Sequence, residues 1–250
     1  MKLKLILVTF LTSFLGFSQD YSFEWGQQMK SKTSIFDIYK IDGNSFYARS
    51  FGKGRNAVIL YYDNLTQASK TIYKPVVNRK PTMMEGNFEI SGKIYTFTSQ
   101  DNEDKTKKTL YVHEFRKSAE PIDIEGKEVT SFEFDSKNKR RSGYTLIASE
   151  DMKKLCVSYY SNPRKKKDAE KGKYGYFILN EDLQIESEGS FDDILEEAGE
   201  SISEYKLSNQ GALFLVTSVA KKDEPTTMKF YKVTGDEINS LELNLGEKYT

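Results

Sequence analysis

A strand–turn–strand unit recurs along the chain and constrains its fold more than any other feature. Runs rich in tyrosine, phenylalanine, valine, isoleucine and threonine alternate with glycine, asparagine, aspartate and lysine, a pattern typical of β-strands joined by turns. The runs fall into four sets, at residues 34–77, 86–126, 144–189 and 201–245. The second run of each set recurs about every 50 residues, so the sequence predicts a repeat protein with four strands per repeat.

The third repeat, which contains YTLIASEDMKKLCVSYYSN, shows how the repeats align. Each repeat has a polar turn between its first two runs. These turns are Asp42-Gly43-Asn44, Ser91-Gly92-Lys93, Asp151-Met152-Lys153-Lys154 and Ser208-Asn209-Gln210-Gly211. When the repeats are aligned on these turns, Cys156 corresponds to Tyr47, Tyr95 and Leu213, which are residue types of a protein core.

A four-stranded antiparallel sheet cannot bury its own faces, so similar sheets are expected to stack on one another. Runs such as ILYY, ALFLV and YFIL are more continuously apolar than a sheet with one wet face requires. We therefore predict an all-β, β-propeller-like array of about four four-stranded antiparallel blades, with a β-sandwich as the alternative. The last run, LELNLGEKYT, suits either a four-blade array or the N-terminal part of a longer one.

Two segments lie outside the repeat. Val129 to Phe134 is one more strand candidate, followed by a basic loop. Residues 190–200 are the best helix candidate, because Ser190 can cap a first turn that contains Asp192, and Gly199 can end it.

The N-terminus has the pattern of a secretory signal peptide. Lys2 and Lys4 precede an apolar run of about 13 residues, which is shorter than the ~20 that a spanning helix needs. We predict cleavage between Ser18 and Gln19, leaving residues 19–250 as a single exported domain. The mature chain has no further segment apolar enough to cross a membrane. The expected location is the periplasm, the cell surface or the medium.

Composition excludes several function classes. Lysine plus arginine and aspartate plus glutamate number 37 each, so a broad nucleic-acid-binding surface is not expected. One cysteine cannot form an internal disulfide, and one histidine leaves little scope for metal binding or acid–base catalysis. We predict no cofactor and no metal.

The N-terminal segment that closes in Phe17-Ser18-Gln19 is similar to signal peptides of Bacteroidota. The repeats that follow, with turns such as SEDMKK and LSNQG and strands such as ALFLVTS and KFYKVTGD, resemble secreted β-propeller-like proteins of that group. The resemblance is one of pattern over nearly the whole mature chain. It implies an envelope or exported protein with an interaction surface, and it implies no catalytic residue.

Reactive side chains have structural interpretations that we prefer. Cys156 lies between Leu155 and Val157 and is expected to be a small buried residue, and His113 points away from its neighbour Glu114. The acidic loop 101–104 and the basic loop 164–173 are expected to be solvated. The acids at 192–197 resemble a solvated helix face more than the carboxylate pair of a glycosidase.

The tyrosine pairs are the best candidates for a ligand surface, because an exposed ring can stack on a sugar while a buried one fills the core. The four candidates for ligand contact are Tyr62, Tyr160, Tyr174 and Tyr176. We predict an exported, non-catalytic binding or scaffold protein whose partner is an envelope protein or a glycan. The alternative is a hydrolase or lyase acting on a polysaccharide or peptide.

Overall fold

The computed structural model describes most of the chain after residue 34. The described residues are 35–51, 57–64, 66–116, 118, 120–122, 125–134, 140–163, 173–192, 194–195, 200–219, 226–235 and 237–243. The chain divides into two compact units, Met1–Lys32 and Thr33–Thr250, and every described residue lies in the second unit. The predicted signal peptide therefore lies outside the described residues.

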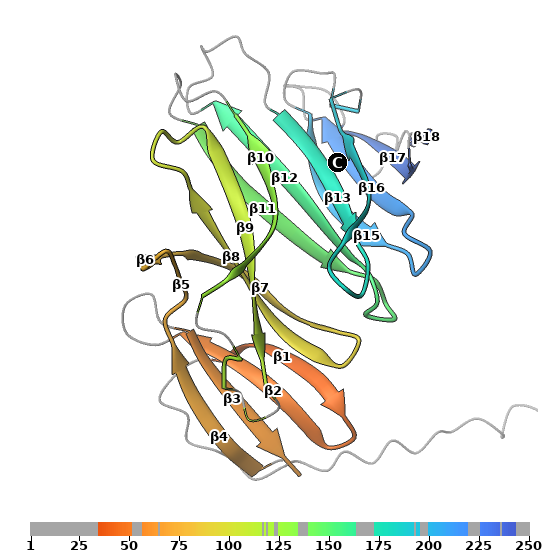
Figure 1. Ribbon diagram of the computed structural model, residues 1–250. Coiled ribbons are helices and arrows are strands. Elements are labelled where there is room, and N and C mark those ends of the chain that lie inside the picture. The colour runs from red at the N-terminus through yellow and green to blue at the C-terminus, as the bar shows by residue number, and fades with distance from the viewer. Residues whose placement is uncertain are drawn as a thin grey trace, which may run out of the picture. The chain divides into compact units, whose positions relative to one another are not determined.

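Four four-stranded antiparallel sheets follow one another along the chain (Figure 1). The strands of the first and second sheets are β1 (Ile35–Asp42), β2 (Ser45–Phe51), β3 (Ala57–Asp63), β4 (Thr66–Tyr73), β7 (Met83–Ile90), β8 (Lys93–Asp101), β9 (Lys107–Phe115) and β10 (Lys127–Glu133). Those of the third and fourth are β11 (Arg140–Ala148), β12 (Leu155–Pro163), β13 (Lys173–Leu179), β14 (Ile185–Ser190), β15 (Ser201–Leu207), β16 (Leu213–Val219), β17 (Thr227–Thr234) and β18 (Glu237–Leu243). A two-stranded hairpin of β5 (Val76–Val77) and β6 (Lys80–Pro81) lies between the first two sheets in the chain.

Each sheet is a meander, because its four strands are hydrogen-bonded in chain order. The turn residues explain the first hairpins. Ser91 and Gly92 have φ of 48° and 77°, the combination of a type I′ turn, whose twist matches that of the paired strands. Gly43, with φ 48°, provides the left-handed backbone conformation in the turn between β1 and β2.

Two predictions about secondary structure are wrong. The fourth strand of the second sheet is β10 rather than residues 121–126, where only isolated bridges form at Pro121 and Glu125. Residues 190–192 and 194–195 form a turn rather than the start of a helix. In this turn Asp192 N donates to Ser190 Oγ at 3.0 Å. Ser190 thus caps a single turn, as its side chain predicts, while Phe191 and Ile194 are buried and hold that turn against the core. Residues 196–199 lie outside the described part.

The second and third sheets pack face to face on a large apolar core. The second sheet contributes Phe97, Leu110 and Phe132, and the third contributes Leu155 and Val157. All five are at most 5% exposed. The opposite face of the third sheet packs on the fourth sheet through a second apolar cluster.

The first sheet contacts the second through a smaller core with polar groups inside it. Tyr47, Ile59 and Tyr73 pack on Ile94 and Phe115 of the second sheet. The second and third sheets are therefore covered on both faces, which explains the continuous apolar run YFIL in β13 of the third sheet.

The first strands of successive sheets lie next to each other, since β1 contacts β7, β7 contacts β11 and β11 contacts β15. Their turns are also linked. Ser91 N donates to Met152 O at 3.1 Å, and Asp151 N donates to Asn209 Oδ1 at 3.1 Å. This serial stacking confirms the propeller-like prediction over the two-layer sandwich. Within the described residues the array is open, because no strand pairing joins the first sheet to the fourth.

No helix in the described part of the chain has the length and apolar character needed to cross a membrane.

Candidate functional site

The fourth sheet exposes an apolar face at a position where the preceding sheets are buried. Leu213 faces the third sheet, as Leu155 faces the second, so the two residues occupy equivalent positions in successive repeats. Because side chains alternate along a strand, the next residue, Phe214, is then the counterpart of Cys156. The sequence alignment of Cys156 with Leu213 is therefore wrong by one residue. Cys156 is 0% exposed and Phe214 is 43% exposed.

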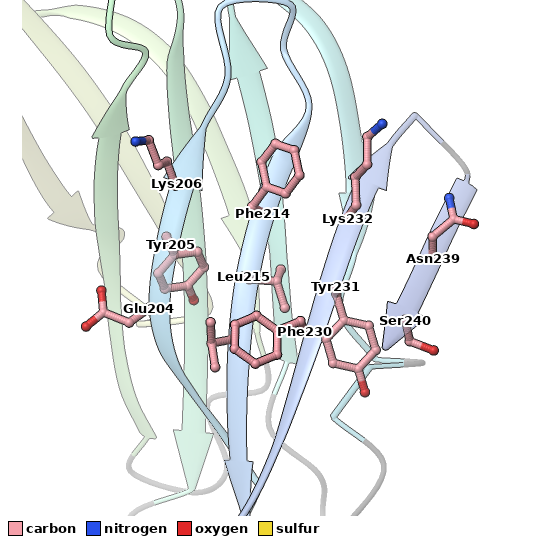
Figure 2. Close-up of a pocket in the computed structure, with 11 residues that line it drawn as sticks. Glu204, Tyr205, Lys206, Phe214, Leu215, Phe230, Tyr231, Lys232, Asn239 and Ser240 are labelled. Carbon is pink, nitrogen blue, oxygen red and sulfur yellow. The ribbon is translucent and has the colours of Figure 1, made fainter. Parts of the chain in front are cut away.

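The exposed face forms the apolar groove, defined by Phe214, Val216 and Phe230 and rimmed by polar side chains (Figure 2). Its volume is about 540 Å³, within the ~300–1,000 Å³ of typical ligand sites. Phe214 pairs in register with Lys206 of β15 and with Lys232 of β17. Figure 2 shows the Phe214 ring between these two lysines. The groove thus combines an aromatic floor with a mainly cationic rim.

A second candidate, the acidic pocket, lies between the second sheet and the turn that joins β13 to β14, with a volume of about 380 Å³. Its titratable lining residues are Tyr95, Glu114, Glu125, Glu128, Asp182, Lys93 and Lys127. Burial, with smaller contributions from Glu114 and Asp182, raises the pKa of Tyr95 to about 12. The Tyr95 hydroxyl is therefore neutral and able to donate a hydrogen bond over the whole physiological pH range.

Sequence reasoning missed the acidic pocket. Tyr95 and Glu114 are cross-strand neighbours on β8 and β9, whereas Asp182 comes from the next repeat. Ser91 Oγ donates to Glu181 Oε2 at 2.8 Å, and this contact holds the turn that carries Asp182 against the second sheet. No local sequence pattern could indicate this meeting of two repeats.

The four predicted ligand-contact tyrosines have different environments. Tyr62 is 2% exposed and stacks on Phe46 with ring centroids 4.5 Å apart. Tyr176 is 2% exposed, stacks on Phe191 and donates to Gly235 O at 3.1 Å. Tyr160 and Tyr174 are partly exposed and pair in register. Only these last two retain side-chain surface for a ligand.

Several tyrosines of the third sheet cover a glycine on the neighbouring strand. Tyr159 lies over Gly175 and Tyr176 over Gly189, each pair being in register. A Cβ added at Gly189 would lie 2.8 Å from the Tyr176 ring. These rings therefore occupy the space that the glycines leave open, which gives the repeated tyrosines a packing role.

His113 is 1% exposed and hydrogen-bonded at both ring nitrogens. Tyr73 Oη lies 2.6 Å from Nδ1, and Thr98 Oγ1 lies 3.0 Å from Nε2. Gly126 makes room for the ring, because a Cβ there would lie 2.7 Å from it. His113 thus joins the first sheet to the second as a structural group.

Buried carboxylates elsewhere are also held by partners. Glu85 accepts a hydrogen bond from Ser99 Oγ, and burial raises its pKa. Glu200 accepts from Thr217 Oγ1 at 2.6 Å and lies 3.8 Å from Lys229 Nζ.

The charged loops fall outside both candidate sites. Lys108 forms a salt bridge with Asp101 at 2.8 Å, and Lys80 forms one with Glu103 at 2.8 Å. No group of His, Cys, Asp and Glu that could hold a metal ion occurs among the described residues. Residues 164–172 of the basic loop, like 196–199 of the predicted acidic helix, lie outside the described part.

Cys156 is expected to be inert in the folded protein. It is 0% exposed, and burial raises the pKa of its thiol. Because the thiolate is the reactive form, a thiol reagent at pH 8 should modify the native chain at least about 100-fold more slowly than the urea-unfolded chain. If the thiol reagent releases a chromophore on reaction, the absorbance of that chromophore measures the labelling rates of the native and the unfolded chain. Rapid stoichiometric labelling of the native protein would show that Cys156 is accessible.

Comparisons with known proteins show no family for the chain. No protein-family model matches the chain, and no curated protein matches it. Similar solved structures include an endo-arabinase from Bacteroides thetaiotaomicron, with 13% identity, a TM-score of 0.42, and coverage of 78% of this chain and 74% of that one. An α-L-arabinanase from Penicillium chrysogenum has 11% identity, a TM-score of 0.43, and coverage of 86% of this chain and 67% of that one.

The β-propeller domain of the Trilobed protease from Pyrococcus furiosus has 14% identity and a TM-score of 0.45, with 84% of this chain aligned. The present chain spans 57% of that domain. By name, two of these three proteins are an endo-arabinase and an arabinanase, and the third is a domain of a protease. At these identities and TM-scores they assign no activity to the chain.

Proposed function

We propose that the chain is a non-catalytic binding protein that packs the apolar groove of its fourth sheet against a β-sheet of a partner protein. The observation that carries this proposal is the 43% exposure of Phe214 at a position buried in the preceding repeats. Phe230, on the neighbouring strand, is 39% exposed on the same face. An exposed apolar surface rimmed by polar residues is typical of a protein–protein interaction site.

A β-sheet is the occupant that this surface favours, because the groove continues an interface already present in the chain. The corresponding face of the third sheet, with Cys156 and Ile178, is covered by the fourth sheet. The groove is the same kind of face one repeat further on. Lys206 and Lys232 on its rim favour a partner sheet with carboxylates at its border.

The location of the protein belongs to the same proposal. Residues 1–18 have the composition of a signal peptide, which supports export to the periplasm, the cell surface or the medium. The pattern-level resemblance to secreted Bacteroidota proteins points the same way.

The groove is tested by photo-crosslinking in cells that express the full chain. We expect p-benzoylphenylalanine at position 214 to crosslink to a β-strand of a partner protein, with the crosslinked peptide identified by mass spectrometry. The same amino acid at Ile72, which is 64% exposed on β4, is the matched control. Phe230→Glu should lower the crosslinking yield from position 214 at least about tenfold, as expected of a central interface residue.

Three outcomes would contradict the proposal. The first is equal yield at positions 214 and 72. The second is a crosslink to another copy of this chain. The third is a yield that Phe230→Glu leaves unchanged.

The acidic pocket favours one second function, a hydrolase acting on a glycan. Glu114 and Asp182 line the same pocket as Tyr95, and glycoside hydrolysis uses a pair of carboxylates. The test is release of reducing sugar from a panel of polysaccharides. Activity that Glu114→Gln abolishes would support this function over non-catalytic binding. Glu150→Gln, on an exposed turn, is the control and should retain the activity.

A further inference from the structure

The acidic pocket contains carboxylates that nothing in the described residues neutralises. Glu114, Glu128 and Asp182 have no hydrogen-bond or ion-pair partner for their carboxylates within the described part of the chain. Elsewhere the half-buried Glu85 and the buried Glu200 do have partners, in Ser99 and Thr217 respectively. Unpaired carboxylates that converge on one cavity favour a positively charged occupant.

A second observation is independent of the acids. Tyr95 is only 5% exposed, lines the pocket, and has no hydrogen-bond partner for its hydroxyl among the described residues. Its hydroxyl is not one of the fully buried polar atoms that lack a partner, so it keeps solvent contact and can donate to a ligand in the pocket. Its ring also offers the π-face on which an organic cation rests.

The charge of the lining favours a cation, and its shape favours an organic one. The four acids Glu114, Glu125, Glu128 and Asp182 outnumber the two lysines, Lys93 and Lys127. Glu114 is half-buried, and the other three acids are exposed, as the lysines are. Apolar side chains complete the wall, namely Val112, Ile122, Val129 and Leu183. They suit the aliphatic stem of a ligand rather than a hydrated metal ion.

The side chains that would hold the charge are fixed by the fold. Tyr95 and Glu114 are directly opposite each other on β8 and β9. Asp182 lies in a turn closed by Asn180, whose Oδ1 accepts from Asp182 N at 3.0 Å and from Gln184 N at 2.9 Å. A ligand therefore meets a preformed arrangement, which lowers the cost of binding.

We propose that the acidic pocket binds an organic cation, a ligand whose ammonium or guanidinium group lies among Glu114, Asp182 and the Tyr95 hydroxyl while its stem contacts the apolar wall. This site is separate from the apolar groove and is not required for binding there.

Isothermal titration calorimetry on the full chain tests the site with butylguanidine and its neutral isostere butylurea. We expect butylguanidine to bind one site with a Kd of roughly 1 mM, as befits so small a ligand, and butylurea not to bind. Higher salt should weaken binding of the cation, because screening reduces its attraction to the partly exposed carboxylates.

Two variants locate the site. Glu114→Gln with Asp182→Asn should weaken butylguanidine binding at least about tenfold, and Tyr95→Phe should weaken it about fivefold while preserving the ring. Glu150→Gln is the matched control for the loss of an exposed negative charge and should leave the Kd unchanged. Circular dichroism of each variant shows whether it is folded.

The proposal is overturned if butylguanidine does not bind, if butylurea binds equally, or if the folded pocket variants bind as the wild type does. Binding of a neutral oligosaccharide in place of butylguanidine would also overturn it and would favour the hydrolase. Loss of crosslinking at the apolar groove would leave all of these results unaffected, so the two proposals fail separately.

Discussion

Replacement of Phe97 by alanine is expected to destabilise the protein by about 3–5 kcal/mol. Phe97 is 0% exposed at the centre of the core between the second and third sheets. Its ring makes an edge contact with Phe88, with centroids 6.0 Å apart. Removing the ring loses this contact and leaves a cavity that two stacked sheets cannot readily close, because their hydrogen-bonded strands move together.

Urea unfolding followed by circular dichroism measures the change in the free energy of unfolding. If this free energy depends on urea concentration with a similar slope in the variant and the wild type, stability alone has changed. Phe230→Ala is the matched control, because Phe230 is a phenylalanine at the centre of a strand that is 39% exposed. We expect it to cost less than about 1 kcal/mol. Equal losses from the two substitutions would contradict the assignment of Phe97 to a core and of Phe230 to a free face.

Gly175→Ala is expected to destabilise the third sheet by about 2–3 kcal/mol. A Cβ at this position would lie 2.5 Å from the carbonyl oxygen of Gly189 and would also overlap the Tyr159 ring. The carbonyl belongs to the neighbouring strand and cannot rotate away. Tyr159 in turn stacks on Phe132 of the second sheet, with centroids 4.6 Å apart, so displacing its ring disturbs the core as well.

Gly43→Ala is the control for this prediction. Gly43 has φ 48°, and a Cβ added there would meet nothing within 4 Å, so alanine carries only the backbone cost of about 1 kcal/mol. In a Tyr159→Ala background, Gly175→Ala should lower the free energy of unfolding by less than it does in the wild type, but still measurably, because the clash with Gly189 O persists. A Gly175→Ala protein as stable as the wild type would show that the two strands are further apart than the register implies.

The hairpins could be predicted because their causes are local. Ser91-Gly92 can adopt the φ values of a type I′ turn, and alternating β-branched and aromatic residues favour the strands on either side. The same local logic failed at residues 190–192 and 194–195. Ser190 caps a turn there, but Phe191 and Ile194 are buried against the core, and that contact is not visible in a helix-capping pattern.

The candidate sites could not be predicted, because both depend on which face of a strand meets a neighbouring sheet. An error of one residue in aligning Leu213 with Cys156 exchanged a buried side chain for an exposed one, since successive side chains point to opposite faces. The sequence pattern does not distinguish Tyr62 and Tyr176 from surface tyrosines, yet in the fold Phe46 and Phe191 stack on them.

Strand period and turn chemistry act over a few residues, and they suffice to specify a series of four-stranded β-meanders from the amino-acid sequence. The stacking of the meanders is what leaves Phe214 on an open face and brings Tyr95, Glu114 and Asp182 to one pocket. Burial and charge proximity arise between sheets whose strands are distant in the chain. A two-residue period is satisfied equally well by either face of a strand, so it cannot select the face that another sheet will cover.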